Sequence, residues 1–209
     1  LSVERLVNAY RQGIFPWFSD EEPILWWSPA PRWVMRPQDV KISRSLGKKL
    51  RQAFFDVTYD LAFEAVIKAC AAPRSGQGGT WITQDMQRAY SGLHQAGYAH
   101  SFECWRDGVL VGGLYGVAVG CCFFGESMFR RETDASKVAL AWLVASLRTV
   151  GAELLDCQFT TTHLASLGAI EIPQSQYLQL LSQAQRPYSS AEVAAGRALA
   201  EAVGDGLVA

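Results

Sequence analysis

An aspartate and a glutamine stand two residues apart in a short apolar run, ELLDCQF, at residues 153–159. The run alternates as a β-strand does, so Asp156 and Gln158 are expected on one face of that strand. If the face is buried, each polar group needs a partner, because an unpaired one costs about 1–3 kcal/mol. The pattern by itself favours a structural hydrogen-bonded pair. The functional alternative is a carboxylate that orients an amide against a reacting group.

A glutamate stands in a second strand-like run, CCFFGESMF, at residues 121–129. Strict alternation predicts that Phe124, Glu126 and Met128 share one face. Gly125 precedes the glutamate, and a glycine inside a strand often marks the close approach of a ligand or another backbone. Two interpretations of Glu126 stay open: it binds a cation, or it lies at the edge of a sheet.

Basic residues are concentrated between residues 32 and 51, which hold seven of the 19 lysines and arginines, although the net charge of the whole chain is only −1. This stretch holds seven basic residues and one acid, a net charge of +6, which leaves −7 for the remainder. Such a basic stripe either contacts a polyanion or forms a solvated face. Its members are Arg32, Arg36, Lys41, Arg44, Lys48, Lys49 and Arg51.

An aromatic segment precedes and overlaps the start of the basic stripe. Four tryptophans and several prolines lie between Phe15 and Val34, which predicts an irregular segment and no regular element. The segment is either a small core wrapped by proline turns or a flat aromatic surface that stacks on a base or ring. The second interpretation is slightly favoured.

The composition is that of a globular protein, with 49% hydrophobic and 19% charged residues among 209. This excludes disorder over most of the chain. No apolar run reaches the roughly 18 residues of a membrane-spanning helix, and the first residues lack the apolar core of a secretory signal. Five cysteines, two of them adjacent, are typical of reduced thiols. We therefore expect a cytoplasmic protein with no membrane contact.

Helical and strand-like patterns follow one another in a mixed order, which predicts an α+β fold. Thr83 is expected to cap a helix, and the RDG sequence at 106–108 to turn a hairpin. The expected helices cover 3–12, 61–71, 84–96, 134–150, 161–166 and a stretch that Pro173 opens, and the expected strands cover 98–105, 109–119, 121–129 and 153–159.

Three other kinds of chemistry find little support. The three histidines are scattered and no CxxC or HxxxH spacing occurs, so no metal site is expected. Cys157 is close in sequence to His163 but is expected to point away from Asp156 and Gln158, as an inert buried thiol. The glycines at 112–120 match neither a Rossmann nor a P-loop spacing, so no nucleotide cofactor is expected.

Several strings of the chain resemble the bacterial leucyl/phenylalanyl-tRNA–protein transferase family. The matches run in order from about residue 2 to residue 181. They are YRQGIFPWF (10–18), ILWWSPAPR (24–32), GTWIT (79–83), AHSFECW (99–105), LVGGLYGVAVG (110–120), FFGESMF (123–129), ASKVAL (135–140), LDCQ (155–158) and HLASLGA (163–169).

The resemblance implies an aminoacyltransferase. The family moves Leu or Phe, and Met less well, from aminoacyl-tRNA to the N-terminal amine of proteins that begin with Arg or Lys, which marks them for degradation by the N-end rule. It implies no cofactor, and we expect a monomer. It also implies a small N-terminal domain at 1–36, an acetyltransferase-like mixed sheet flanked by helices at 37–187, and a tail at 188–209 that is helical or frayed.

The resemblance also assigns roles to residues. It places the catalytic pair at Asp156 and Gln158, with Glu126 as a third acidic residue that holds the terminal ribose or a cationic acceptor. Asp156 would fix the amide of Gln158, which holds the amine. The pocket for the aminoacyl side chain is expected from Trp81, Leu114, Met128, Leu140 and Leu143. The tRNA is expected to contact Trp26, Trp27, Arg44, Lys48, Lys49 and Arg51.

The chain departs from the family pattern at its ends. A glycine-rich stretch that usually precedes Leu1 is missing, so the N-terminal domain is expected to be incomplete. Gln174 stands where the family typically has an arginine after Ile-Pro. Two alternative functions stay open: a transferase that feeds aminoacyl-tRNA to cell-wall peptide or lipid, and a non-catalytic tRNA-binding module.

Overall fold

A seven-stranded mixed sheet forms the centre of the computed structural model, which describes all residues except 20–21, 74–79, 160 and 186–209. The strand order is β4-β5-β6-β7-β8-β3-β9, and all neighbours are antiparallel except β7 and β8. A separate two-stranded ribbon pairs β1 with β2. The strands are β1 (Phe15–Pro16), β2 (Trp26–Trp27), β3 (Arg32–Met35), β4 (Asp56–Tyr59), β5 (Ala99–Arg106), β6 (Val109–Val119), β7 (Cys122–Arg130), β8 (Leu154–Gln158) and β9 (Ile170–Ile172).

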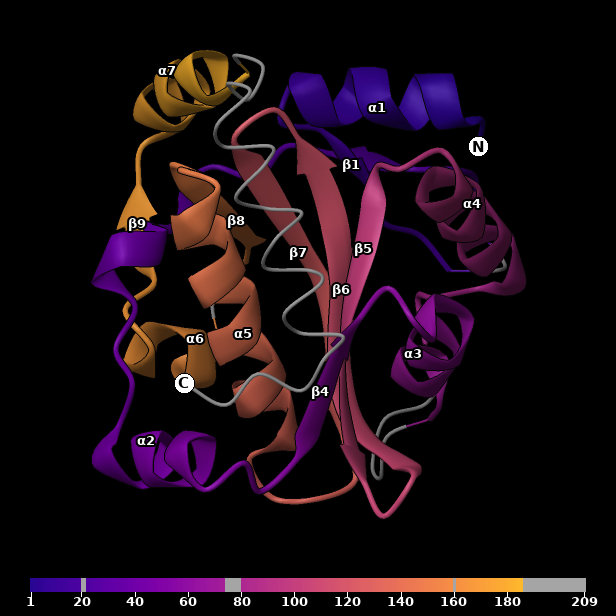
Figure 1. Cartoon of the computed structure of the whole chain (residues 1–209). Coiled ribbons are helices and arrows are strands. Elements are labelled where there is room, and N and C mark those ends of the chain that lie inside the picture. Colours follow the sequence, from indigo (N-terminus) through magenta and orange to yellow (C-terminus); the bar gives the residue numbers. More distant parts are fainter. Residues whose placement is uncertain (20–21, 74–79, 160, 186–209) are drawn as a thin grey trace.

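Helices cover both faces of the sheet (Figure 1). On one side lie α3 and α4, with α1 and α7 across the end of the strands, and on the other side lie α5, α6 and α2. The predicted α+β class is confirmed. The helices are α1 (Val3–Arg11), η1 (Pro37–Asp39), α2 (Arg44–Arg51), α3 (Phe63–Ala71), α4 (Gln84–Gln95), α5 (Ala135–Thr149), α6 (Thr162–Ser166) and α7 (Gln174–Ala184).

Each face of the sheet has its own apolar core. One core joins α1, α3, α4 and α7 to the sheet and contains Tyr10, Tyr90 and Tyr177. The other joins α2 and α5 to the opposite face and contains Leu140 and Leu143. Because alternate residues of a strand face opposite ways, a strand such as β8 supplies both cores.

The main helices and strands lie close to their predicted positions, and the local signals that predicted them are seen in the structure. The Thr83 hydroxyl accepts a hydrogen bond from the Met86 amide and caps α4, and Gly97 at φ +78° ends it. Asp107 and Gly108 both have positive φ in the tight turn between β5 and β6, as a two-residue hairpin requires.

Seven short elements escape the sequence patterns. The sequence predicts no regular structure for β1, β2, β3, β4, β9, η1 or α2, but the structure has all seven, so the prediction of no regular element between Phe15 and Val34 is wrong. Each is eight residues or shorter, too short to show a clear hydrophobic period. β3 belongs to the large sheet, between β8 and β9, and so places the aromatic segment against the strand of Asp156. The predicted tail at 188–209 lies outside the described residues, and the division at residue 36 stays a prediction.

A β-bulge interrupts β7 at Glu126. Ser127 pairs with Tyr115 and Gly125 pairs with Gly116, so Glu126 is the extra residue. The bulge reverses the alternation: Phe124 packs in one core and Met128 against the other. The prediction that Phe124, Glu126 and Met128 share a face is therefore wrong for Met128. Within the described residues, no helix has the length and apolar character needed to cross a membrane.

Candidate active site

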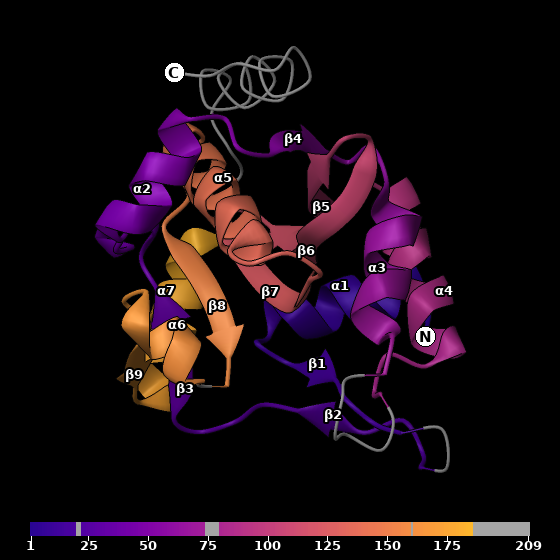
Figure 2. The same ribbon diagram turned by 90° about the horizontal axis from the view of Figure 1, so that it is seen from below.

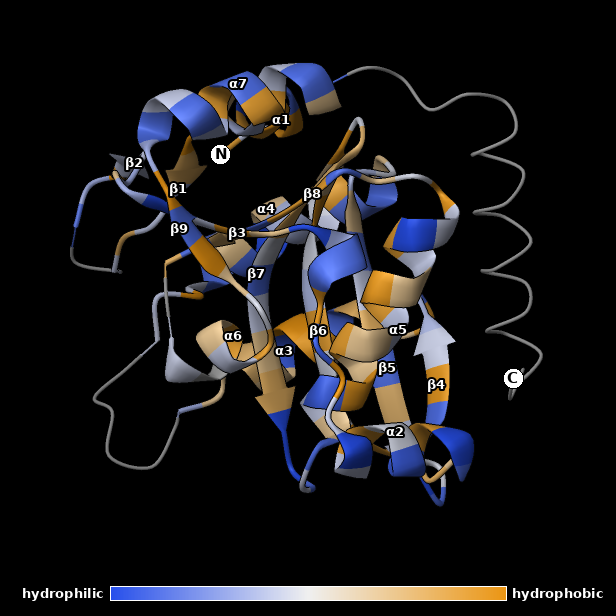
Figure 3. Cartoon of the chain, turned by 90° about the vertical axis from the view of Figure 1, so that its left-hand side faces the viewer, coloured by the Kyte–Doolittle hydropathy of each residue, from blue (hydrophilic) through white to orange (hydrophobic). Residues whose placement is uncertain are grey.

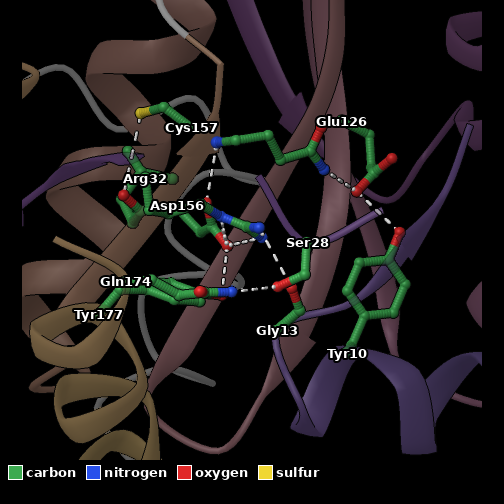
Figure 4. A network of polar contacts seen from close by, with 11 residues as sticks. Tyr10, Gly13, Ser28, Arg32, Glu126, Asp156, Cys157, Gln174 and Tyr177 are labelled. Carbon is green, nitrogen blue, oxygen red and sulfur yellow. Dashed lines mark hydrogen bonds and ion pairs between the residues drawn. The ribbon is translucent and has the colours of Figure 1, made fainter. Parts of the chain in front are cut away.

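Asp156 is the centre of a buried ion pair. Its side chain has no exposed surface, and its two oxygens accept hydrogen bonds from Arg32 Nε at 2.9 Å and Arg32 Nη2 at 2.7 Å. The Tyr177 hydroxyl donates a third bond at 2.7 Å, and the backbone amide of Gln158 a fourth at 2.8 Å. Figure 4 shows these contacts converging from β3, β8 and α7. All four are direct contacts, so little of the carboxylate is left to bind a substrate.

Arg32 is held as tightly as its partner. Its Nη1 donates to the Gly13 carbonyl at 3.1 Å, and its guanidinium lies between the rings of Phe15 and Tyr177, at 5.0 and 4.5 Å from their centroids. The pair therefore ties the N-terminal segment and α7 to β8. Arg32 was counted in the basic stripe, but this interpretation is wrong for Arg32, because the residue is fully buried and paired.

Glu126 is the second carboxylate of the site. Tyr10 donates to its Oε1 at 2.7 Å, Tyr90 to its Oε2 at 2.9 Å, and the Gln158 side-chain amide to Oε1 at 2.8 Å. Burial raises the pKa of Glu126 to about 7, although its hydrogen bonds from Tyr10 and Tyr90 act to lower it. The residue thus stands near the midpoint of its titration at neutral pH.

Gln158 joins the two carboxylates. Its backbone amide donates to Asp156, while its side-chain amide donates to Glu126. The expectation that Asp156 fixes the amide group of the side chain is therefore wrong, because that group is held by Glu126. Gln158 also has φ +60°, a conformation that costs a non-glycine residue about 1–3 kcal/mol. The bond from its backbone amide to Asp156 fixes this turn at the end of β8.

A cavity of about 450 Å³ opens beside this polar cluster. All five residues that were predicted as the side-chain pocket line it: Trp81, Leu114, Met128, Leu140 and Leu143. Met35, Leu155 and Leu164 extend its apolar wall, and Glu126, Asp156 and Gln158 also line it. The cavity joins an apolar floor to two polar residues, the half-buried Glu126 and the buried Gln158.

An exposed tryptophan at the cavity did not stand out in the sequence. Trp17 lines the cavity and is 37% exposed, whereas Trp26 and Trp27 lie outside the lining. The Trp17 ring packs against Phe159 at 5.3 Å and against Trp27 at 5.6 Å. The FPWF string carries this residue, and its ring contact with Phe159 places it beside the end of β8.

The remaining basic residues lie away from the cavity. Helix α2, with Arg44, Lys48 and Arg51 exposed, is at the opposite end of the molecule from β1 and β2 (Figure 2). Lys49 differs from them because it pairs with Asp134 at 2.8 Å. Figure 3 shows how hydrophilic residues predominate along α2.

Two further residues that the sequence analysis singled out are Cys157 and Gln174. Desolvation raises the pKa of the Cys157 thiol, and the residue packs toward the core opposite Asp156, as expected of an inert thiol. The prediction that it is buried is wrong, because Cys157 is half-buried and lines the cavity. Gln174, the departure from the family pattern, donates to the Ser28 hydroxyl at 3.2 Å and so links α7 to the loop after β2.

The chain is similar to known proteins over nearly its whole length. A family model described as leucyl/phenylalanyl-tRNA protein transferase matches residues 34–182, and the model of that family's N-terminal domain matches residues 1–30. A solved GCN5-related N-acetyltransferase-like protein of Streptococcus suis superposes with a TM-score of 0.38 at 14% identity, over 81% of this chain and 63% of that one.

Curated relatives are much more similar. A leucyl/phenylalanyl-tRNA–protein transferase of Novosphingobium aromaticivorans is 64% identical over 206 residues, which cover 98% of this chain and 78% of that protein. One of Methylococcus capsulatus is 57% identical over 183 residues, 88% of this chain and 78% of that protein. The cavity and its polar cluster therefore belong to a member of the leucyl/phenylalanyl-tRNA–protein transferase family.

Proposed function

We propose that this protein transfers Leu or Phe, and Met less well, from aminoacyl-tRNA to the N-terminal amine of proteins that begin with Arg or Lys. The observation that carries the proposal is the cavity, whose apolar floor adjoins Gln158 and Glu126. Walls formed mainly by leucines, together with a flexible methionine, suit Leu, Phe and Met alike, and discriminate weakly among them. We further propose that the enzyme acts as a monomer in the cytoplasm, where its acylated tRNA is made.

The transfer reaction requires little chemical activation by the protein. The aminoacyl ester is already activated, and an α-amine with a pKa of about 7.7–8.0 is partly neutral at physiological pH. The enzyme then supplies position and handles one proton. In this proposal Gln158 holds the attacking amine through its side-chain oxygen. Asp156, itself held by Arg32 and Tyr177, keeps Gln158 in place by accepting from its backbone amide.

The proposal is tested by transfer of radiolabelled Leu from Leu-tRNA to a peptide that begins with Arg, beside a peptide that begins with Ala. We expect label on the Arg peptide alone. Label on neither peptide, with tRNA still bound, would instead favour a binding module or another acceptor. Label on both would overturn the proposed acceptor specificity.

We propose that Trp17 stacks on the terminal adenine of the tRNA, with Trp27 behind it. Trp17→Ala is expected to weaken binding of Leu-tRNA by about 10- to 100-fold, because base–aromatic stacking contributes about 1–3 kcal/mol. Trp26→Ala is the matched control, since Trp26 packs against Arg5 outside the cavity. Filter binding at fixed salt measures both. If only the Trp26 variant binds weakly, the terminal base lies on β2.

We propose that α2 binds phosphates of the acceptor stem. Replacing Arg44, Lys48 and Arg51 with glutamine is expected to weaken tRNA binding and to reduce its dependence on salt. The slope of log K against log salt falls by about 0.9 for each phosphate that the protein no longer neutralises. Lys49 is kept because Asp134 already pairs with it. Lys68→Gln, on α3 across the sheet, is the control. An unchanged slope would place the tRNA elsewhere.

A further inference from the structure

Glu126 has an unusual set of neighbours for a carboxylate in a cavity. Two phenol hydroxyls, from Tyr10 on α1 and Tyr90 on α4, donate to its two oxygens and also contact each other. Burial raises the pKa of both phenols, so both remain proton donors. The carboxylate therefore has fixed donors from two helices, and Glu126 is also one of the residues that line the cavity.

One oxygen of Glu126 keeps room for another partner. Oε1 accepts from Tyr10 and from the Gln158 amide, whereas Oε2 accepts from Tyr90 alone. A carboxylate oxygen can accept two hydrogen bonds, so Oε2 has one site left. Because the Gln158 side-chain amide donates to Oε1 of the same carboxylate, an amine held by Gln158 would lie close to Oε2.

Asp156 has both of its oxygens occupied by protein donors. Both of its oxygens are engaged by the Arg32 guanidinium, and Tyr177 donates to one of them. Apart from Asp156, the titratable groups that face Glu126 are Tyr10, Tyr90 and the buried hydroxyl of Tyr115 on β6. No cation among the described residues pairs with Glu126 directly, which leaves it the free carboxylate of the site.

We propose that Glu126 is the proton shuttle of the transfer reaction, through its Oε2 atom, and that Asp156 is a positioning residue. This inference rests on the proposed function. The attacking nitrogen forms a bond to the ester carbonyl carbon and gives one proton to Glu126. The bond from that carbon to the ribose oxygen then breaks, and Glu126 gives the proton to the departing oxygen. The shuttle ends in its starting state, and no co-reactant is needed.

The pKa of Glu126 suits both steps of the shuttle, in which the carboxylate takes a proton from the amine and then gives it to the ribose oxygen. A shuttle works best when its pKa lies near the operating pH, since it must both take and return the proton. Burial raises the pKa of Glu126 to about 7. Below that pH the carboxyl is protonated and cannot accept, so transfer should fall as the pH falls.

The test compares the wild-type protein with Glu126→Gln, which keeps the shape and one of the two acceptor oxygens. Single-turnover transfer of Leu to an Arg peptide is measured from pH 5.5 to 8.5 with tRNA saturating. The ionisation of the peptide amine is common to both proteins and cancels in the ratio of their rates. We expect the ratio to be about 10²–10⁴ above pH 7 and to fall about tenfold per pH unit below it.

Two further variants separate this role from a structural one. Tyr90→Phe removes a donor that lowers the pKa of Glu126. The pH at which the transfer rate reaches half of its maximum should therefore be higher in this variant than in the wild type. Glu103→Gln is the matched control, because Glu103 is also a buried carboxylate that accepts from two hydroxyls, those of Thr58 and Ser101, outside the cavity. Its rate per folded molecule should equal that of the wild type at every pH.

The outcomes are distinct. The shuttle is overturned if the rate ratio does not change with pH, or if the lower transfer rate of Glu126→Gln is explained by weaker tRNA binding. In both cases transfer by the wild type still supports the proposed function. If the wild-type protein itself transfers no Leu, the proposed function fails, and the shuttle fails with it. A pH-dependent ratio with a shifted midpoint in Tyr90→Phe supports the shuttle.

Discussion

Replacing Asp156 with alanine is expected to lower the free energy of unfolding by about 3–5 kcal/mol, because it leaves the buried Arg32 guanidinium without its partner. Transfer per folded molecule should also fall by about 10²-fold or more. The backbone amide of Gln158 loses the acceptor that fixes its φ of +60°, and a shift of about 1 Å at a reacting group costs that much.

A double variant separates the contribution of Asp156 to stability from its contribution to transfer. Arg32→Met with Asp156→Leu replaces the ion pair with apolar side chains, and such exchanges are often neutral or stabilising. We expect this protein to regain part of the lost stability, because Tyr177 and Gly13 still lose their partners, but none of the lost transfer, because nothing then accepts from the Gln158 amide. Denaturant unfolding and single-turnover transfer measure the two quantities.

A weaker variant completes the series. Tyr177→Phe removes one donor to Asp156 and leaves the ion pair, so it should cost about 1.5–3 kcal/mol. If Asp156→Ala is as stable as the wild type, the ion pair does not hold the site as the structure indicates. If the double variant regains transfer, Asp156 is not needed to place Gln158.

The sequence predicted the contents of the cavity better than the geometry of its polar cluster. All five predicted pocket residues line the cavity, because a resemblance over long strings carries residue positions with it. The alternation rule failed at Glu126, since a β-bulge has no signature in the period of hydrophobic residues. A glycine before the glutamate was the only sign of irregular backbone.

Residues that act across the sheet were the hardest to predict. Arg32 belongs to a run of basic residues in the sequence, but the antiparallel pairing of β3 and β8 places it against Asp156, 124 positions away. Tyr10 and Tyr90 likewise reach Glu126 from two helices that have the pattern of ordinary amphipathic segments. A buried partner depends on tertiary pairing, which composition and spacing do not encode locally.

The bulge itself gives the second large prediction. Gly116 pairs with Gly125 beside the bulge, and a Cβ at Gly116 would overlap the carbonyl oxygen of Phe124 and the ring of Phe123. The carbonyl belongs to the backbone of β7 and cannot move away as a side chain can. Gly116→Ala is therefore expected to lower the free energy of unfolding by about 3 kcal/mol, at the upper end for overpacking.

The strain in Gly116→Ala should also lower the rate of transfer. Relief of the overlap requires β7 to move away from β6, which displaces Glu126 from Tyr10 and Gln158. We expect transfer per folded molecule to fall together with stability in Gly116→Ala. Gly125→Ala is the control for stability, because its Cβ meets nothing closer than the Asp156 carbonyl oxygen at 3.5 Å. Equal melting temperatures for the two variants would show that the bulge adapts, and that Glu126 does not depend on the glycine pair for its position.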